Sequence, residues 1–230
     1  MRAGGSLVMN RTTKAGPART AEADRLDAGL AALGLDDTPP GARAALLAYL
    51  SLLSQWGRTF NLTAIRDPLR MVSHHLLDSL AVLPALDDAL RGRATARVLD
   101  MGSGAGLPGL PLAALRADVC FTLIDSVGKK AGFMRQAAGE MGLANVEVRH
   151  GRVEDETEVF DVVMARAFAP LPRLVTLAGP RLVPGGCILA LKGDLPDEEH
   201  VAGMDVALVD VPFVEGRRQI VRVDIGPQNG

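Results

Sequence analysis

The sequence is poor in aromatic residues, in cysteine and in long apolar segments. Phenylalanine, tryptophan and tyrosine make up 3% of the 230 residues, so leucine, valine and alanine have to fill most of the core. No apolar run approaches the roughly 20 residues that cross a bilayer, so no membrane-spanning segment is predicted. Cys120 and Cys187 lie in apolar, strand-like stretches, and we expect both to be reduced and buried. The histidines and cysteines lack the spacing of a zinc site, so no metal is predicted.

No charge of one sign dominates the chain, whose formal net charge of −2 is not that of a typical nucleic-acid-binding protein. The charge is unevenly spread, however. Residues 193–230 hold eight acidic and three basic residues, which leaves 22 basic and 19 acidic residues, a net charge of +3, in residues 1–192. A local basic face on that larger part is therefore compatible with the composition.

The first 95 residues show helical patterns only. Residues 1–20 lack the apolar core of a secretory signal, and their Gly, Ala, Thr and Pro content predicts a disordered leader. Leucines at helical spacing predict a helix over 21–35, and a second helix begins near Pro40 and runs to Trp56. Asp67 and Pro68 predict the start of a third helix, which Pro84 ends. We therefore expect residues 21–95 to form an N-terminal helical extension.

From residue 96 onward, short apolar runs alternate with helical stretches. Strands are predicted at 97–101, 119–125, 146–150, 160–165 and 187–192, helices at 107–115, 128–141 and 171–182, and a closing pair of strands at 206–211 and 219–223. Such alternation is typical of a doubly wound, Rossmann-like α/β fold with a seven-stranded, mostly parallel sheet. Residues 96–230 are predicted to form one ligand-binding domain.

A glycine-rich turn, DMGSGAG over Asp100–Gly106, follows the first predicted strand. Glycine lets the backbone adopt positive φ and approach a ligand closely, and this turn lies at the carboxyl edge of the sheet, where ligands bind. Gly104 to Gly109 also matches the G-x-G-x-x-G pattern of dinucleotide-binding proteins. However, a carboxylate at Asp100 repels a pyrophosphate and suits the cationic aminoacyl end of S-adenosylmethionine. Asp125, at the end of the second strand, can bind the ribose of either cofactor.

No second substrate domain of a dehydrogenase is evident in the sequence. We therefore favour S-adenosylmethionine as the cofactor and a class I S-adenosylmethionine-dependent methyltransferase fold. A dinucleotide cofactor, and a glycine turn with a purely structural role, stay open as alternatives.

Seven motifs occur in one order between residues 46 and 193. They are WGRTFNLTAI (Trp56–Ile65), HHLLDSLAVL (His74–Leu83), LDMGSGAGLPGLP (Leu99–Pro111), LIDSVGKK (Leu123–Lys130), RVE (Arg152–Glu154), ARAF (Ala165–Phe168) and LALKG (Leu189–Gly193). Together they resemble the bacterial 16S rRNA guanine-N7 methyltransferases, a family also called RsmG or glucose-inhibited division protein B. The resemblance implies a cytoplasmic, monomeric enzyme that methylates one guanine of the small ribosomal subunit, near the decoding centre.

The resemblance also implies cofactor contacts at Gly102, Leu107, Val153, Glu154 and Arg166. With the residues of the glycine turn and the second strand, the predicted cofactor-binding set is Asp100, Gly102, Gly104, Gly106, Leu107, Asp125, Val153, Glu154 and Arg166.

The predicted chemistry requires no acid or base, because guanine N7 carries a free lone pair and accepts a methyl group without deprotonation. No catalytic residue is therefore assigned. Arg166 is given a role in positioning the cofactor or the guanine, and His74 and His75, on a Leu-rich helix, a capping or packing role. The residues predicted to contact RNA are Lys129, Lys130, Arg135, Arg58 and Lys192, with Arg66, Arg70, Arg149 and Arg152 as further candidates.

Two other functions stay open at this stage. A small-molecule methyltransferase could use the same fold, with the N-terminal helices enclosing its substrate. A non-catalytic cofactor-binding or RNA-binding module is the other alternative, although an intact glycine turn with Asp125 and Arg166 argues against loss of cofactor binding. The form of an RNA substrate, whether naked rRNA, mature subunit or assembly intermediate, is also open.

Overall fold

The computed structural model describes residues 17–60 and 62–225, with side chains from residue 21 onward except at 58–60. The described chain begins with two long helices, α1 (Pro17–Ala32) and α2 (Pro40–Phe60). Because α1 starts at Pro17, residues 17–20 are helical and do not belong to the leader; proline is favoured at the first position of a helix. The rest of the predicted leader, residues 1–16, lies outside the described residues. In the described part of the chain no helix is long and apolar enough to cross a membrane.

The third predicted helix is divided into several shorter elements: α3 (Pro68–Met71), a π-helical turn η1 (Val72–Leu77), α4 (Asp78–Leu80) and α5 (Leu83–Ala89). Its start is as predicted, because the Asp67 carboxylate accepts a hydrogen bond from the Arg70 N–H at 2.7 Å and Pro68 occupies the first turn. The prediction for its end was wrong. Pro84 lies in the first turn of α5, where its missing N–H costs no helical hydrogen bond.

Seven strands form one sheet in the order β3-β2-β1-β4-β5-β7-β6, and only β7 runs antiparallel to its neighbours β5 and β6. This confirms the predicted seven-stranded, mostly parallel sheet. The strands are β1 (Ala96–Met101), β2 (Val119–Asp125), β3 (Val146–His150), β4 (Phe160–Arg166), β5 (Leu182–Lys192), β6 (Met204–Leu208) and β7 (Gln219–Asp224). The connecting helices are α6 (Gly109–Leu115), α7 (Gly128–Glu140) and α8 (Leu171–Ala178), with 3-10 turns η2 (Val153–Asp155), η3 (Gly179–Arg181) and η4 (Asp197–Glu199).

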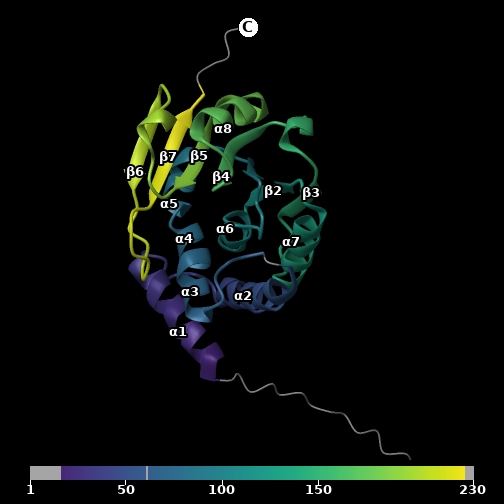
Figure 1. Ribbon diagram of the computed structural model, residues 1–230, viewed down its shortest axis with the longest axis vertical. Coiled ribbons are helices and arrows are strands. Elements are labelled where there is room, and N and C mark those ends of the chain that lie inside the picture. Colours follow the sequence, from purple (N-terminus) through teal and green to yellow (C-terminus); the bar gives the residue numbers. More distant parts are fainter. Residues whose placement is uncertain (1–16, 61, 226–230) are drawn as a thin grey trace, which may run out of the picture.

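Side chains that alternate along the strands fill two cores on opposite faces of the sheet. Val98 of β1 joins the larger core with residues of the N-terminal helices such as Leu46, whereas the next residue, Leu99, joins the smaller core with Leu174 of α8. Figure 1 shows α1, α2 and α3 gathered at one end of the molecule and α8 at the other. The N-terminal helices therefore share the core of one sheet face instead of building a core of their own.

Three local predictions need correction. The helix after the glycine turn begins at Gly109 and not at Leu107. Strand β5 begins at Leu182, so the predicted end of the preceding helix at 182 was too late. Cys187 is buried as expected, but Cys120 is exposed. Its neighbours Val119 and Phe121 are buried, and strand alternation turns Cys120 to the other side.

Candidate functional site

The glycine turn connects β1 to α6 at the carboxyl edge of the sheet. Gly102, Gly104 and Gly106 all have positive φ, between 61° and 79°, a region that other residues rarely adopt. The turn is held to β2 by the N–H groups of Gly102 and Ser103, which both donate to the Ile124 carbonyl, at 2.9 and 3.2 Å. The sequence therefore uses glycine here because this backbone conformation requires it.

Asp100, the first residue of the turn, is fully buried. Its Oδ2 atom accepts a hydrogen bond from the Gly109 N–H at 2.9 Å, whereas its Oδ1 atom has no hydrogen-bond partner among the described residues. Burial raises the pKa of this carboxyl from 3.8 to about 7, although the bond from Gly109 opposes the shift. An unpartnered buried carboxylate oxygen suits a ligand that brings a cationic donor.

Asp125, at the end of β2, is also buried and holds the turn from the other side. Its two oxygens accept hydrogen bonds from the N–H groups of Gly104 at 3.0 Å and Val127 at 2.9 Å, and Lys130 Nζ lies 3.4 Å from Oδ2. Asp125 faces a cavity of about 380 Å³, which we name the Asp125 cavity. Its wall includes Gly102, Asp125, Val127, Val153, Glu154 and Phe168.

Phe168 belongs to the ARAF motif, but the sequence predicted no role for it. In the structure it lines part of this cavity. Its ring packs so closely on Gly102 that a Cβ atom added to Gly102 would lie 2.2 Å from Cδ2 of the ring. The preceding residue, Ala167, has a φ of 50° and lines both the Asp125 cavity and a second cavity next to it. The segment after β4 therefore forms the boundary between two cavities.

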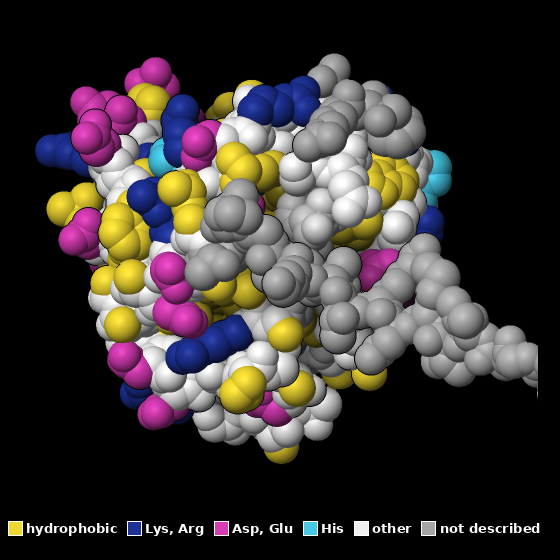
Figure 2. Space-filling view, turned by 90° about the horizontal axis from the view of Figure 1, so that it is seen from below, with side chains coloured by type: hydrophobic (Ala, Val, Ile, Leu, Met, Phe, Trp, Pro, Cys, Tyr) yellow, Lys and Arg dark blue, Asp and Glu magenta, His cyan; other side chains and the backbone are white. Residues whose placement is uncertain are grey.

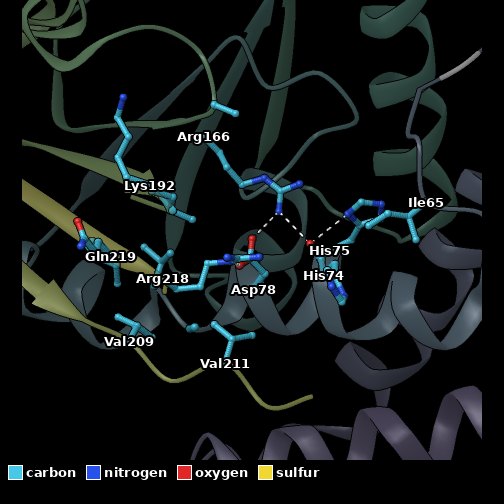
Figure 3. A pocket seen from close by; sticks show the side chains of 16 residues that line it. Ile65, His74, His75, Asp78, Arg166, Lys192, Val209, Val211, Arg218 and Gln219 are labelled. Carbon is cyan, nitrogen blue, oxygen red and sulfur yellow. Dashed lines mark hydrogen bonds and ion pairs between the residues drawn. The ribbon is translucent and has the colours of Figure 1, made fainter. Parts of the chain in front are cut away.

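The second cavity, which we name the Asp78 cavity, has a volume of about 300 Å³ and lies among the ends of β4, β5 and β7 and the π-helical turn (Figure 3). Asp78 is central to it. The Arg166 Nη1 group donates to Oδ2 of Asp78 at 2.8 Å, and the Arg218 Nε group donates to Oδ1 at 2.9 Å. Arg166 Nη1 also lies 3.2 Å from the His74 carbonyl oxygen. Lys192 lines the same cavity but forms an ion pair with Glu199 at 2.6 Å.

His75 lies on the wall of the Asp78 cavity and is mostly buried. Burial, aided by the positive charge of Arg166, lowers the pKa of His75 from 6.5 to about 4, so the ring is neutral at physiological pH. Its Nε2 atom is 2.7 Å from the Thr63 hydroxyl, which in turn accepts a hydrogen bond from the Ile65 N–H at 3.1 Å. These contacts fix the loop after α2 and agree with the packing role expected for this residue.

The predicted cofactor residues occupy three different environments. Gly102, Asp125, Val153 and Glu154 line the Asp125 cavity. Asp100, Gly104 and Gly106 lie in the glycine turn and Leu107 directly follows it, and a Cβ atom at Gly106 would meet Leu110 at 2.4 Å. Arg166 differs, because its guanidinium is bound to Asp78 and lines the neighbouring cavity.

The residues predicted to bind RNA also differ in their surroundings. Lys129 and Arg135 are exposed, whereas Lys130 is partly held by Asp125. Lys192 is largely buried, and its charge is neutralised by Glu199. Of the further candidates, Arg149 is bound by three glutamates, Glu147, Glu156 and Glu158. The side chain of Arg58 lies outside the described residues. On the face formed by the N-terminal helices, acidic and basic side chains are interspersed over the atoms drawn in colour (Figure 2).

Sequence reasoning missed Asp78, Arg218 and Tyr49. Asp78 stands within a quoted motif, but its partners Arg166 and Arg218 are 88 and 140 residues away. The fully buried Tyr49 hydroxyl donates to the Ala105 carbonyl at 2.8 Å, which ties α2 to the glycine turn. In the described residues no group of three or more histidine, cysteine, aspartate and glutamate side chains could hold a metal ion.

Comparisons with known proteins agree on one family. The model of the family described as rRNA small subunit methyltransferase G matches residues 42–221. A protein named ribosomal RNA small subunit methyltransferase G from Leptothrix cholodnii is 46% identical over 207 residues, which cover 86% of this chain and 93% of that protein. A protein of the same name from Neisseria meningitidis serogroup C is 45% identical over 205 residues, with coverage of 86% and 96%.

Solved structures support the fold. A Listeria monocytogenes protein, provisionally described as a class I S-adenosylmethionine-dependent methyltransferase, superimposes with a TM-score of 0.54. It is 12% identical in sequence, and the match covers 94% of this chain and 90% of that one. At this identity the similarity concerns the fold alone.

Proposed function

Because this chain belongs to the rRNA small subunit methyltransferase G family, we propose that it transfers the methyl group of S-adenosylmethionine to N7 of a guanine in 16S rRNA, near the decoding centre. The structural observation that supports the proposal, in addition to family membership, is the pair of adjoining cavities. The buried carboxylate Asp125 lines one cavity, arginines line the other, and Ala167 borders both. A donor in the first cavity can therefore meet an acceptor in the second.

The residues around the Asp125 cavity fit S-adenosylmethionine. Asp100 has an unpartnered buried oxygen at the glycine turn, and the aminoacyl end of the cofactor supplies an ammonium group. Asp125 is placed to accept hydrogen bonds from ribose hydroxyls, and the backbone at Val153 and Glu154 is available for the adenine. The sulfonium of the bound cofactor supplies the methyl group, and the protein's own part is to bind and align.

The groups around the Asp78 cavity agree with a reaction that needs alignment and no proton transfer. Its buried histidine, His75, has a pKa lowered to about 4 and is committed to Thr63, so it is a poor general base. Arg166 emerges from the end of β4 at the boundary of the two cavities, and we assign it a positioning role for the guanine. Holding N7 in line with the methyl group provides the rate acceleration.

We also propose that the protein acts as a monomer in the cytoplasm, where small ribosomal subunits are found. Residues 21–95 would then serve as a helical extension of the catalytic domain, residues 96–230. Lys129, Lys130 and Arg135 lie on α7, and Lys130 lines the Asp125 cavity, so these are the predicted residues that we expect to meet RNA phosphates. Light scattering of the purified protein, alone and with small subunits, tests the monomer proposal.

Methyl transfer can be tested directly with isotopically labelled S-adenosylmethionine. The protein is incubated in parallel with small subunits from cells that lack this methylation, with free 16S rRNA and with a metabolite extract. Label should enter 16S rRNA, and chemical cleavage specific for N7-methylguanosine should map it to one position. Label found only in small molecules would contradict the proposal and favour a small-molecule methyltransferase.

Asp125→Ala should weaken cofactor affinity about tenfold or more, because hydrogen bonds between charged and neutral groups contribute about 1.5–3 kcal/mol. Asp118→Ala is the matched control, since Asp118 directly precedes the same strand and is exposed, with Arg116 as its partner. Equal affinities for the two variants, measured by calorimetry, would refute the ribose assignment.

A further inference from the structure

We propose that the Asp78 cavity binds one phosphodiester group of the RNA chain beside the target guanine, through the guanidinium groups of Arg166 and Arg218. This inference rests on the proposed function, and it assigns a ligand and a residue that the chemistry of methyl transfer alone does not require. Arg218 comes from the connection between β6 and β7 and had no role in the sequence-based interpretation.

The charges of the cavity match such a ligand. Its described wall contains four Asp, Glu, Lys or Arg residues: Asp78, Arg166, Lys192 and Arg218. The charge of Lys192 is cancelled by Glu199, so two guanidinium groups face one carboxylate and leave one net positive charge. A phosphodiester carries one negative charge and would neutralise it. A neutral base alone would leave the charge uncompensated.

The geometry also suits a phosphate oxygen. Asp78 uses one oxygen for each arginine, so the two guanidinium groups are held beside each other on a carboxylate that is 12% exposed (Figure 3). Each arginine still has N–H groups with no hydrogen-bond partner among the described residues, including Nη2 of both. Planar guanidinium groups with several parallel donors match phosphate better than a single ammonium group does. Asp78 is thus a positioning residue for the two arginines.

An independent sign of positive potential comes from the neighbouring histidine. After burial, the positive charge of Arg166 is the largest cause of the low pKa of His75, ahead of the opposing negative charge of Asp78. The side chains of Arg166 and Arg218 are 22% and 30% exposed, which limits screening by water and salt. An anion in the cavity would therefore be bound more strongly than at an open surface.

The proposal places the phosphate next to the reacting atoms. Ala167 follows Arg166 and borders the Asp125 cavity, so a phosphodiester on Arg166 would anchor the backbone at the nucleotide whose base meets the methyl donor. Phosphate contacts of this kind fix the register of a nucleic acid without reading its sequence. The arrangement would restrain the target nucleotide while leaving N7 free.

The test compares Arg218→Met with Arg222→Met. Arg222 lies four residues further along the chain in β7, is 32% exposed and pairs with Asp88 and Asp224 away from the cavity, so it is a matched control. The dissociation constant for undermethylated small subunits is measured with S-adenosylhomocysteine present, at KCl concentrations from about 50 to 200 mM. Methylation kinetics and cofactor affinity are measured for the same proteins, and thermal unfolding checks that each variant is folded.

Arg218→Met should make the slope of log affinity against log salt shallower by about 0.7–0.9, the value for one lost phosphate contact. The KM for small subunits should rise about tenfold or more, with cofactor affinity and kcat little changed. Arg218→Lys, which keeps the charge but not the planar donor group, should retain most of the slope and recover part of the KM. Arg222→Met should behave as the unmodified protein.

Equal slopes for Arg218→Met and Arg222→Met would overturn the phosphodiester assignment while leaving methyl transfer intact. A loss of cofactor affinity in Arg218→Met, with an unchanged slope, would also overturn it, because the cavity would then serve the cofactor. Failure of the unmodified protein to methylate rRNA would instead contradict the proposed function. In that case a shallower slope for Arg218→Met would still identify the cavity as a phosphate site.

Discussion

Replacing Asp100 by asparagine should stabilise the cofactor-free protein and weaken its binding of S-adenosylmethionine. The carboxyl is fully buried, accepts one hydrogen bond from Gly109 and leaves its other oxygen without a partner among the described residues. Asparagine has nearly the same shape, and its oxygen can still accept from Gly109. The substitution therefore removes the buried charge with little change in packing.

The size of the effect follows from the pKa. Burial raises the pKa of Asp100 from 3.8 to about 7, a difference of about three units, and each unit corresponds to about 1.4 kcal/mol. The pKa of Asp100 is higher in the folded than in the unfolded state. The contribution of the protonated carboxyl to stability is therefore fully present below pH 4 and is lost as the pH rises through 7. The unmodified protein should thus lose up to ~4 kcal/mol at pH 8 relative to a neutral side chain.

Urea unfolding of both proteins at pH 5 and pH 8 measures this loss. The stability advantage of Asp100→Asn should grow by about 2–3 kcal/mol between the two pH values, because most of the linked proton release falls in this window. Affinity for S-adenosylmethionine in the unmodified protein should increase as the pH rises through 7, and the variant should bind weakly at every pH. Asp118→Asn, an exposed acid with a pKa lowered by Arg116, should show no such growth. A stability difference independent of pH would refute the reasoning.

Two further substitutions test the site. Gly102→Ala should lower cofactor affinity and stability more than Gly104→Ala, because both positions have positive φ but only Gly102 would place a Cβ against Phe168. A double variant with Phe168→Ala should recover only the steric part of the loss. Equal effects at the two glycines, measured by calorimetry and thermal unfolding, would contradict this prediction. His75→Asn should reduce the free energy of unfolding by about 1–3 kcal/mol through the lost Thr63 contact while kcat falls less than tenfold. A loss of kcat of a hundredfold or more at unchanged stability would instead make His75 a catalytic base.

Local sequence patterns were sufficient for the sheet and the glycine turn. Apolar runs bounded by turn residues located the parallel strands β1 to β4 within a residue at most of their ends. For β1, β2 and β4 the reason is that a strand buried on both faces has a mostly apolar sequence, whereas β3, at the edge of the sheet, shows alternating apolar and polar residues. Asp100 and Asp125 could be assigned to one edge for a similar reason, since successive parallel strands end on the same side of a sheet.

The interruption of the third helix was not accessible to the same reasoning. Its sequence remains apolar and helical in pattern through the π-helical turn, and nothing in it distinguishes one type of helical hydrogen bonding from another. The exposure of Cys120 was likewise missed, because its strand is apolar throughout and only the position of the covering helices decides which residues stay open. The first error concerns the type of helical hydrogen bonding, and the second concerns tertiary packing.

The sequence by itself determined the fold, the glycine turn and the placement of Asp100 and Asp125 at one sheet edge, because each depends on residues close together in the chain or on the ends of adjacent strands. Only the tertiary structure decided the second half of the site. Asp78 meets Arg166 and Arg218 across 88 and 140 residues, and Lys192 proves to be committed to Glu199. The sequence does not distinguish these charged side chains from one another, because their partners are distant in the chain. Folding determines which of them are neutralised by an ion pair and which still face a cavity.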